Sequence, residues 1–319
     1  MKKYNFLIFT LSLFFSCENM ETVVDLEIPE SQPVLVLNSL LDTDRPIQVL
    51  ISHSVGAFSQ NIPTCINDAD VVLYENNIFL DTLKINLDST MYHYFYHDGG
   101  FDSIPMHYYE SNTIPNKDSN YRIDASHVNY PSISATTYIP NDIEIYDVQI
   151  DTLTHEDQIG FNFSFLDNPN MDNYYRLKLY SSCTKEWVDE LTGEMQSYSF
   201  NGYVEMMSND PSFPGGLPWN GYTFVGNKVV FSDALFNGEE KNIRLDIESS
   251  FRYENCDTIR VQFSVFSADT YSYYNSLTDH RGNGALSIFG GEVIPVYSNV
   301  ENGLGSLIST NAQIIQIKP

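Results

Sequence analysis

Two histidines have a spacing that is compatible with metal binding. His93 and His97 stand four residues apart in an aromatic stretch, and on a helix they would share one face, as metal ligands do. The aromatic residues around them favour a strand instead. In a strand, four residues at about 3.3 Å each separate the two side chains by about 13 Å, too far to coordinate one ion. We therefore predict no metal site here.

Acidic and amide side chains near residue 170 offer oxygen ligands for calcium. Asp167, Asn170 and Asp172 lie close together in the sequence, and calcium takes six to eight such ligands from flexible loops. The stretch lacks the glycine and the terminal glutamate of a calcium loop, and Asp-Asn-Pro-Asn is ordinary turn chemistry. A plain turn is the favoured interpretation.

Catalytic motifs give no reaction class. Gly282-Asn283-Gly284 has no strand before it and an incomplete glycine pattern, which predicts a loop rather than a phosphate-binding turn. The sequence contains no Gly-x-Ser-x-Gly elbow and no His-Glu-x-x-His motif. We expect a protein that is not an enzyme and needs no cofactor. An unrecognised hydrolase stays open as a third reading, because the members of a Ser/His/Asp triad meet only in the fold.

An aromatic segment from Tyr198 to Phe224 is the candidate partner or ligand site. Its Gly, Pro and Asn residues predict a long loop, and long loops without regular structure are often functional. Aromatic side chains with a polar tip anchor protein partners and stack on ligands such as sugars. An insertion packed on its own domain is the alternative. The candidate residues are Tyr198, Phe200, Tyr203, Phe213, Trp219 and Tyr222.

The N-terminus has the pattern of an export signal. Lys2 and Lys3 precede a ten-residue apolar run, Phe6 to Phe15, which is too short to span a bilayer as a helix. Ser16 then precedes Cys17. This predicts a signal peptide over residues 1–16, with Cys17 as the lipidated first residue of the mature chain. The lipobox is imperfect, since Phe14 stands where Leu is commonest, and ordinary secretion is the alternative.

The remaining cysteines would meet an oxidising compartment after export. Cys183 and Cys256 each border a strand-like run and form the candidate disulfide. Sequence does not fix the geometry that a disulfide needs, so the bridge stays open at this point. Cys65 would then be unpaired, in a loop that carries Pro and Asn.

The charge of the chain excludes one class of partner. The formal net charge is −26, and removal of Lys2 and Lys3 with the signal peptide leaves 14 basic against 42 acidic residues, or −28. Nucleic acid binding needs clustered Lys and Arg, so we expect none. Membrane attachment would depend on the lipid rather than on charge, because anionic headgroups repel an acidic protein.

Short β-branched and aromatic runs between Gly, Pro, Asn and Asp clusters predict an all-β fold of sandwich type. We expect a tether over 17–32, an N-terminal sandwich over 33–139 and a C-terminal sandwich over 140–319. One short helix is predicted over 268–280, beginning near Asp269 and ending before Gly282. Predicted strands are 34–38, 47–51, 69–74, 78–83, 91–96, 121–125, 132–138, 143–150, 160–166, 174–181, 229–231, 243–247, 259–266, 292–297 and 312–317.

Several short motifs, in this order, resemble the domain of unknown function 4249 family of Bacteroidota outer-membrane lipoproteins. They cover nearly the whole mature chain. They are Val23-Val24-Asp25-Leu26, Asn173-Tyr174-Tyr175-Arg176-Leu177, Phe231-Ser232-Asp233 with Phe236-Asn237-Gly238, Tyr273-Tyr274, and Ser298-Asn299-Val300-Glu301-Asn302-Gly303-Leu304-Gly305.

The resemblance implies a lipoprotein of two immunoglobulin-like or fibronectin-like β-sandwich domains in tandem. Genes of this family commonly lie beside TonB-dependent outer-membrane receptors, which implies an accessory role in nutrient capture or uptake. No catalytic residue carries over, because the family's chemistry is unassigned. Glu18 and Glu21 resemble a surface-export signal, although an ordinary solvated tether would also contain them. A structural or adhesive cell-surface module is the alternative function.

Overall fold

Strands dominate the fold, as the sequence predicts. The computed structural model describes residues 32–56, 62–97, 100–155, 158–189, 191–216, 218, 221–248, 256–284 and 295–317. Strands make up 61% of the structure and α2 (Ala268–Gly284) is the single helix of these residues, so the all-β class is confirmed. The predicted signal peptide, Cys17 and all but the last residue of the tether lie outside the described residues.

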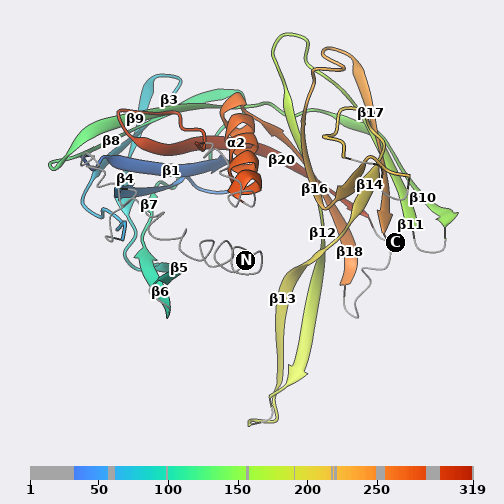
Figure 1. Cartoon of the computed structure of the whole chain (residues 1–319), viewed down its shortest axis with the longest axis horizontal. Coiled ribbons are helices and arrows are strands. Elements are labelled where there is room, and N and C mark those ends of the chain that lie inside the picture. Colours follow the sequence, from blue (N-terminus) through green and yellow to red (C-terminus); the bar gives the residue numbers. More distant parts are fainter. Residues whose placement is uncertain are drawn as a thin grey trace, which may run out of the picture. The chain divides into compact units, whose positions relative to one another are not determined.

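The strands fall into two groups along the chain (Figure 1). The first group is β1 (Leu35–Asp42), β2 (Gln48–His53), β3 (Asp70–Glu75), β4 (Ile78–Ile85), β5 (Met91–His97), β6 (Gly100–Met106), β7 (Tyr109–Glu110), β8 (Ser119–His127) and β9 (Tyr130–Ile139). The second is β10 (Ile145–His155), β11 (Gln158–Leu166), β12 (Tyr174–Val188), β13 (Met195–Tyr203), β14 (Met206–Ser208), β15 (Phe224–Gly226), β16 (Lys228–Ser232), β17 (Glu240–Glu248), β18 (Cys256–Phe266), β19 (Val300–Glu301) and β20 (Leu304–Ile317).

Alternating side chains build the first hydrophobic cluster. Along β1 every second residue is buried, and Leu37 lies opposite Ile51 of β2 in the antiparallel register. Ile123 of β8 reaches the same cluster. In the turn between β1 and β2, the Asp42 carboxylate accepts a hydrogen bond from the Asp44 amide at 3.2 Å. A period of two, read from the sequence, therefore places this core correctly.

The second cluster lies between two sheets. One sheet runs β10-β11-β17-β14-β15, and the facing strands β12, β16 and β18 belong to the large sheet. Aromatic rings fill the space: Phe165 contacts Phe263 with ring centroids 5.0 Å apart, and Tyr175 stacks on Phe263 at 5.5 Å. These pairs bury large apolar areas and so provide much of the stabilisation of this half.

The last long strand joins the two clusters. β20 pairs in parallel with β1 from Leu304 to Thr310, and then pairs antiparallel with β18 as far as Ile317. The large sheet is thereby continuous, in the order β13-β12-β18-β20-β1-β2-β7-β4-β3-β8-β9-β19. Val300 and Leu307 belong with the first cluster. The predicted boundary at residue 140 instead assigns this segment to the C-terminal sandwich. Parallel pairing with a strand far away in the sequence leaves no local pattern, so the sequence did not predict this contact.

Backbone geometry explains the motif that precedes β20. Gly305 has a φ of 102°, and a Cβ atom there would overlap the Leu37 carbonyl oxygen. A Cβ on Gly303 would lie 2.6 Å from Ile133 Cγ2. The Asn299 side chain donates to the Leu307 carbonyl at 2.8 Å and accepts from the Leu307 amide at 2.9 Å. These residues allow β20 to approach β1 closely enough to pair.

A buried hydrogen-bond network accounts for the motifs near residues 173 and 233. The Asp167 carboxylate accepts hydrogen bonds from the Tyr175 hydroxyl and, at 2.8 Å, from the Gly238 amide. Asp233 likewise accepts from the Asn173 amide at 2.7 Å. Burial raises the pKa of the Asp167 carboxyl above its ordinary value, while these hydrogen bonds act in the opposite direction. Residues 167–172 therefore form a turn that is hydrogen-bonded to neighbouring segments, as the favoured interpretation predicts.

The structure corrects the strand predicted over 292–297 and part of the predicted helix. The strand predicted over 292–297 is wrong for residues 295–297, which have no regular structure, and residues 292–294 lie outside the described part. The predicted helix is confirmed as α2, but it continues to Gly284, so its predicted end before Gly282 and the loop predicted at Gly282-Asn283-Gly284 are wrong. Its N-cap is Ser267, whose Oγ accepts from the Thr270 amide at 3.2 Å. Asp269 instead accepts a hydrogen bond from the Tyr297 hydroxyl at 2.7 Å.

Substituting Gly305→Ala should destabilise the protein by about 3 kcal/mol or more, because the new Cβ meets the β1 backbone at a positive φ. Chemical denaturation monitored by tryptophan fluorescence measures this loss. Gly216→Ala is the matched control, since a Cβ at Gly216 meets no atom within 4 Å, and its effect should stay within about 0.5 kcal/mol. Equal stability of the two variants would contradict the close approach of β20 to β1.

Substituting Tyr175→Phe should destabilise the protein by about 1–3 kcal/mol at pH 7, because the buried Asp167 carboxylate loses a donor. A raised pKa in the folded state means that stability is lost as pH rises through that pKa. Without the hydroxyl the pKa rises further, so the destabilisation should be larger at pH 7 than at pH 4. Urea unfolding at both pH values tests this, with the exposed Tyr198→Phe as control. A loss that is independent of pH would refute the role given to the hydroxyl.

Candidate interaction site

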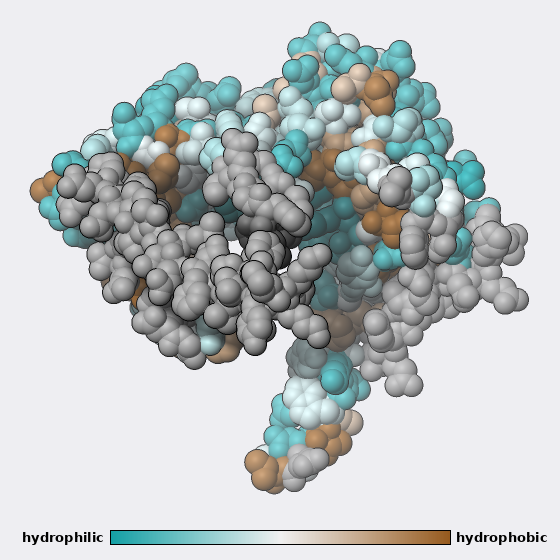
Figure 2. Space-filling model, in the orientation of Figure 1, coloured by the Kyte–Doolittle hydropathy of each residue, from teal (hydrophilic) through white to brown (hydrophobic). Residues whose placement is uncertain are grey.

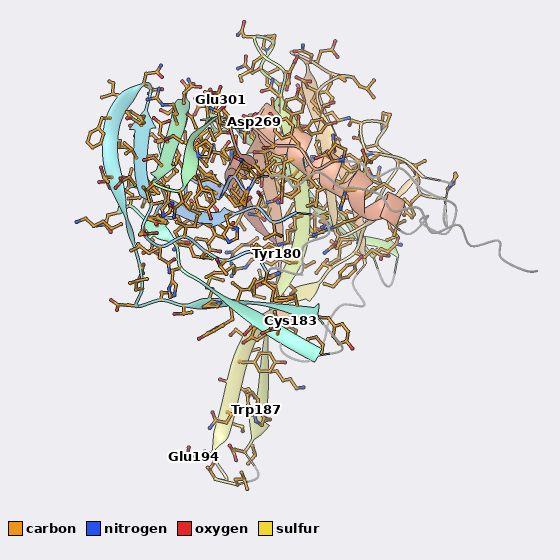
Figure 3. All side chains as sticks on the ribbon, turned by 60° about the vertical axis from the view of Figure 1, so that its left-hand side comes forward. Tyr180, Cys183, Trp187, Glu194, Asp269 and Glu301 are labelled. Carbon is orange, nitrogen blue, oxygen red and sulfur yellow. A yellow bond between two sulfur atoms is a disulfide. The ribbon has the colours of Figure 1, made fainter. Side chains whose placement is uncertain are left out.

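The hairpin of β12 and β13 extends beyond the sheet that covers its base (Figures 1 and 3). Along β12, buried and half-buried residues alternate from Tyr174 to Thr184, and every residue from Lys185 to Val188 is exposed. Tyr175, Leu177 and Leu179 belong to the second cluster. In a strand, residues two apart share a face. The core-facing side of β12 therefore continues past its cover.

Aromatic residues occupy this uncovered face. Trp187 and Tyr198 make an edge contact with ring centroids 5.7 Å apart, and Tyr198 lies 5.6 Å from Phe200. The register places Tyr198 opposite Lys185 and Phe200 opposite Cys183, so all five side chains share one face. The three aromatic residues are between 39% and 48% exposed. We call Trp187, Tyr198 and Phe200 the aromatic face.

The opposite face of the hairpin is polar over its middle. Ser182 and Thr184 of β12 lie opposite Asn201 and Ser199 of β13. Exposed hydrophobic residues return near the tip, where Leu191 is 97% exposed (Figure 2). The Asp189 carboxylate accepts hydrogen bonds from the Leu191 and Thr192 amides, which lower the pKa of that carboxyl. The hairpin is thus amphipathic, and hydrogen bonds to Asp189 stabilise its turn.

A disulfide fastens the base of the hairpin. Cys183 of β12 and Cys256 of β18 are bonded, with Cα atoms 4.2 Å apart and a sequence separation of 73. A Cβ atom on Gly202 would lie 2.8 Å from the Cys183 sulfur, so β13 needs a glycine where it passes the bridge. Cys65 is a free, half-buried thiol. The bridge marks the point where the buried part of β12 ends.

The structure divides the six predicted aromatic residues. Tyr198, Phe200 and Tyr203 are exposed on β13, so the loop prediction is wrong for this part. Phe213 is buried against Phe231, with ring centroids 5.0 Å apart. Trp219 lies outside the described residues.

Tyr222 is held in place by its own domain. Its hydroxyl donates to the Asp246 carboxylate at 2.8 Å, and burial, together with this carboxylate, raises the pKa of the tyrosine. Tyr222 and Phe213 thus follow the alternative of an insertion packed on its own sandwich. The polar residues and the glycine between the aromatic residues of 195–203 hide the alternation of a strand, so the sequence did not predict one here. The aromatic residues themselves are evident in the sequence.

A second exposed hairpin contains the two histidines. β5 and β6 pair only with each other in the described residues, and Tyr92, Tyr94 and Tyr96 are exposed along one face of β5. The predicted strand over 91–96 is confirmed. Across the part of the chain that the structure describes, no group of three or more His, Cys, Asp or Glu side chains is arranged to hold a metal ion.

Two other histidines, His53 and His127, contact structural partners. His53 contacts the Thr64 hydroxyl at 3.1 Å through Nε2 and the Ser54 carbonyl at 3.1 Å through Nδ1. His127 Nε2 lies 3.2 Å from an Asp68 carboxylate oxygen, and its Nδ1 accepts from a backbone amide. At His53 a backbone carbonyl stands where a catalytic triad would have a carboxylate.

In the described residues, no helix combines the length and apolar character needed to cross a membrane.

The fold and the site define an all-β protein that presents a disulfide-fastened aromatic hairpin. Comparison with family models matches residues 21–314 to the domain of unknown function family DUF4249. The chain belongs to this family, as its motifs indicated. No curated protein matches the chain.

Replacing the bridge, as Cys183→Ser with Cys256→Ser, should lower the free energy of unfolding by about 2–4 kcal/mol, because the unfolded chain regains the entropy of a long loop. Denaturation curves measured without reductant test this. Cys65→Ser is the control and should change stability by about 0.5 kcal/mol or less. If the double variant matched the wild type, the bridge would have no part in holding the hairpin.

Proposed function

We propose that this protein is a lipid-anchored outer-membrane protein that acts at the cell surface as a non-catalytic accessory subunit of a TonB-dependent receptor in nutrient capture or uptake. In this proposal a lipid on Cys17 attaches the chain to the membrane. The β12–β13 hairpin docks on the receptor. Support for the receptor as partner comes from the resemblance to lipoproteins whose genes commonly lie beside such receptors.

The aromatic face is the observation that carries the proposal. Trp187, Tyr198 and Phe200 continue a buried face into solvent, and no strand of the described residues covers them. Aromatic side chains have about 150–250 Å² each to bury, and these three residues are 39–48% exposed, so less than half of that area is still open to a partner. A stable interface buries about 800 Å² on each partner. The three residues would therefore supply the aromatic centre of a larger contact, as aromatic anchors commonly do.

Substituting Trp187, Tyr198 and Phe200 together by Ser should reduce receptor recovery at least tenfold when the tagged protein is purified from detergent-solubilised outer membranes. These positions are exposed, so the fold should persist, and a thermal melt checks this. The matched control replaces Tyr92, Tyr94 and Tyr96 by Ser on the other exposed hairpin. That control should leave receptor recovery unchanged.

Two outcomes would overturn the proposal. Wild-type protein that brings down no TonB-dependent receptor would remove the partner and favour the structural or adhesive module. Equal receptor recovery by the wild type and the aromatic-face variant would show that docking uses another surface. Quantitative mass spectrometry of the eluates separates these cases, because it measures receptor and bait in the same sample.

A further inference from the structure

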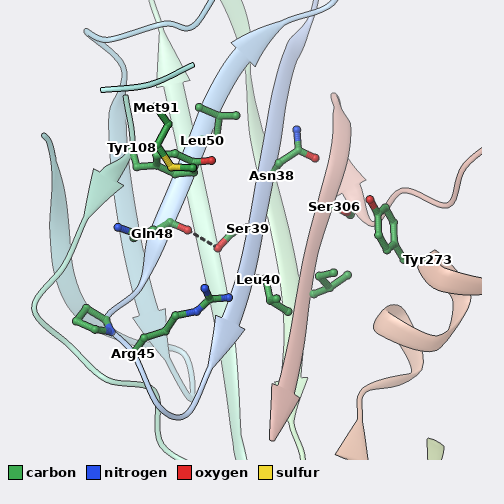
Figure 4. Close-up of a pocket in the computed structure, with 12 residues that line it drawn as sticks. Asn38, Ser39, Leu40, Arg45, Gln48, Leu50, Met91, Tyr108, Tyr273 and Ser306 are labelled. Atoms are coloured by element: carbon green, nitrogen blue, oxygen red, sulfur yellow. Dashed lines mark hydrogen bonds between the residues drawn. The ribbon is translucent and has the colours of Figure 1, made fainter. Parts of the chain in front are cut away.

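A groove on the outer face of β1, β2 and β20 forms a second site, apart from the hairpin (Figure 4). Its volume is about 400 Å³, which falls in the range of small-molecule sites. The base of the β5–β6 hairpin borders it on one side and α2 borders it on the other. We propose that this groove binds a neutral oligosaccharide.

Two tyrosines form opposite walls of the groove. Tyr108 stands beside Met91 at the base of the β5–β6 hairpin, and Tyr273 comes from α2 across the three strands (Figure 4). Both side chains are half-buried, so each ring keeps a surface toward the groove. Sugar rings present C–H groups that pack on aromatic faces, while a tyrosine hydroxyl hydrogen-bonds at the edge. Paired aromatic walls therefore suit a flat, hydroxylated ring.

The floor of the groove supplies both donors and acceptors. The Gln48 amide nitrogen donates to the Glu110 carboxylate at 2.7 Å, which leaves the Gln48 amide oxygen as an acceptor. Asn86 donates to the second Glu110 oxygen at 2.9 Å, so this carboxylate is held in place. Asn38 is exposed in the groove and offers both an NH₂ group and a carbonyl. Hydroxyl groups, which donate and accept, match this mixture.

The charges around the groove favour an uncharged ligand. Arg45 is the cation among its described lining residues, and its Nε lies 3.4 Å from the Asp42 carboxylate. Glu110 adds a second carboxylate beside Gln48. The guanidinium of Arg45 is thus paired with one carboxylate and Glu110 stands beside Gln48, in a chain with a formal net charge of −26. A carboxylate or phosphate ligand would be repelled, whereas Arg45 can still donate to neutral hydroxyls.

The surface beyond the groove favours a ligand longer than one sugar. Met91 lines the groove, and His93 and Phe95 follow it on the same face of β5. The rings of His93 and Phe95 are stacked, with centroids 6.2 Å apart. A saccharide that leaves the groove along β5 would therefore continue over further rings, as stacking ligands do.

This inference deepens the proposed function, since it names the class of nutrient that the accessory subunit would capture. Binding in the groove needs no receptor, and the groove shares no residue with the aromatic face. The two ideas can therefore fail separately. Saccharide binding without receptor recovery would overturn only the docking proposal, and receptor recovery without saccharide binding would overturn only this one.

The test uses the purified mature chain with an array of neutral oligosaccharides of three to six hexoses or pentoses, namely glucans, mannans, galactans and xylans, together with the matching uronic acid oligomers. We expect binding to at least one neutral family. Isothermal titration with the best hit should then give a dissociation constant at least tenfold weaker for Tyr273→Ala and for Asn38→Ala. Tyr198→Ala, on the aromatic face, should bind like the wild type.

Folding and specificity controls keep the outcomes decisive. Tyr273→Phe retains the ring and should lose less affinity than Tyr273→Ala, which separates stacking from a general loss of structure, and thermal melts verify each variant. Binding to no neutral oligosaccharide would overturn the proposal. So would binding confined to uronic acid oligomers, or neutral binding that Tyr273→Ala and Asn38→Ala leave unchanged.

Discussion

The pairing of β20 with two partners is the constraint on which the rest of the structure depends. One strand satisfies its backbone hydrogen bonds with β1 over its first half and with β18 over its second half. The parallel half needs an approach to Leu37 that only a residue without a Cβ permits, which explains Gly305. The two hydrophobic clusters are thereby joined through one continuous sheet.

The β12–β13 hairpin is an extension of the same large sheet. β12 pairs with β18 along its inner part, and every second residue of this part is buried as far as Cys183. Beyond this residue no described strand covers β12, yet its core-facing side still carries Trp187, which shares that face with Tyr198 and Phe200 of β13. A soluble monomer gains nothing by exposing a clustered apolar face. The exposed face supports the proposal of a partner that covers it, and the disulfide lies where the face begins.

Local patterns in the sequence predicted most of the individual strands, because burial on one face leaves a period of two. Leu35, Leu37 and Ile51 show this directly. Long-range relations were not predictable in this way. The parallel register of β20 on β1 joins residues far apart in sequence. Residues 195–203 lack the β-branched pattern of a strand, and among the described strands no second sheet covers them. The separation of exposed Tyr198 from buried Phe213 also depends on packing alone.

Photocrosslinking in living cells tests the central claim most directly. A benzoylphenylalanine placed at position 198, in the middle of the aromatic face, should on irradiation give one dominant adduct with an outer-membrane TonB-dependent receptor, identified by mass spectrometry. The same residue at position 94, on the exposed face of β5, should not give that adduct. Irradiation that yields no receptor adduct at position 198, with the protein present at its normal level in the outer membrane, would contradict the account.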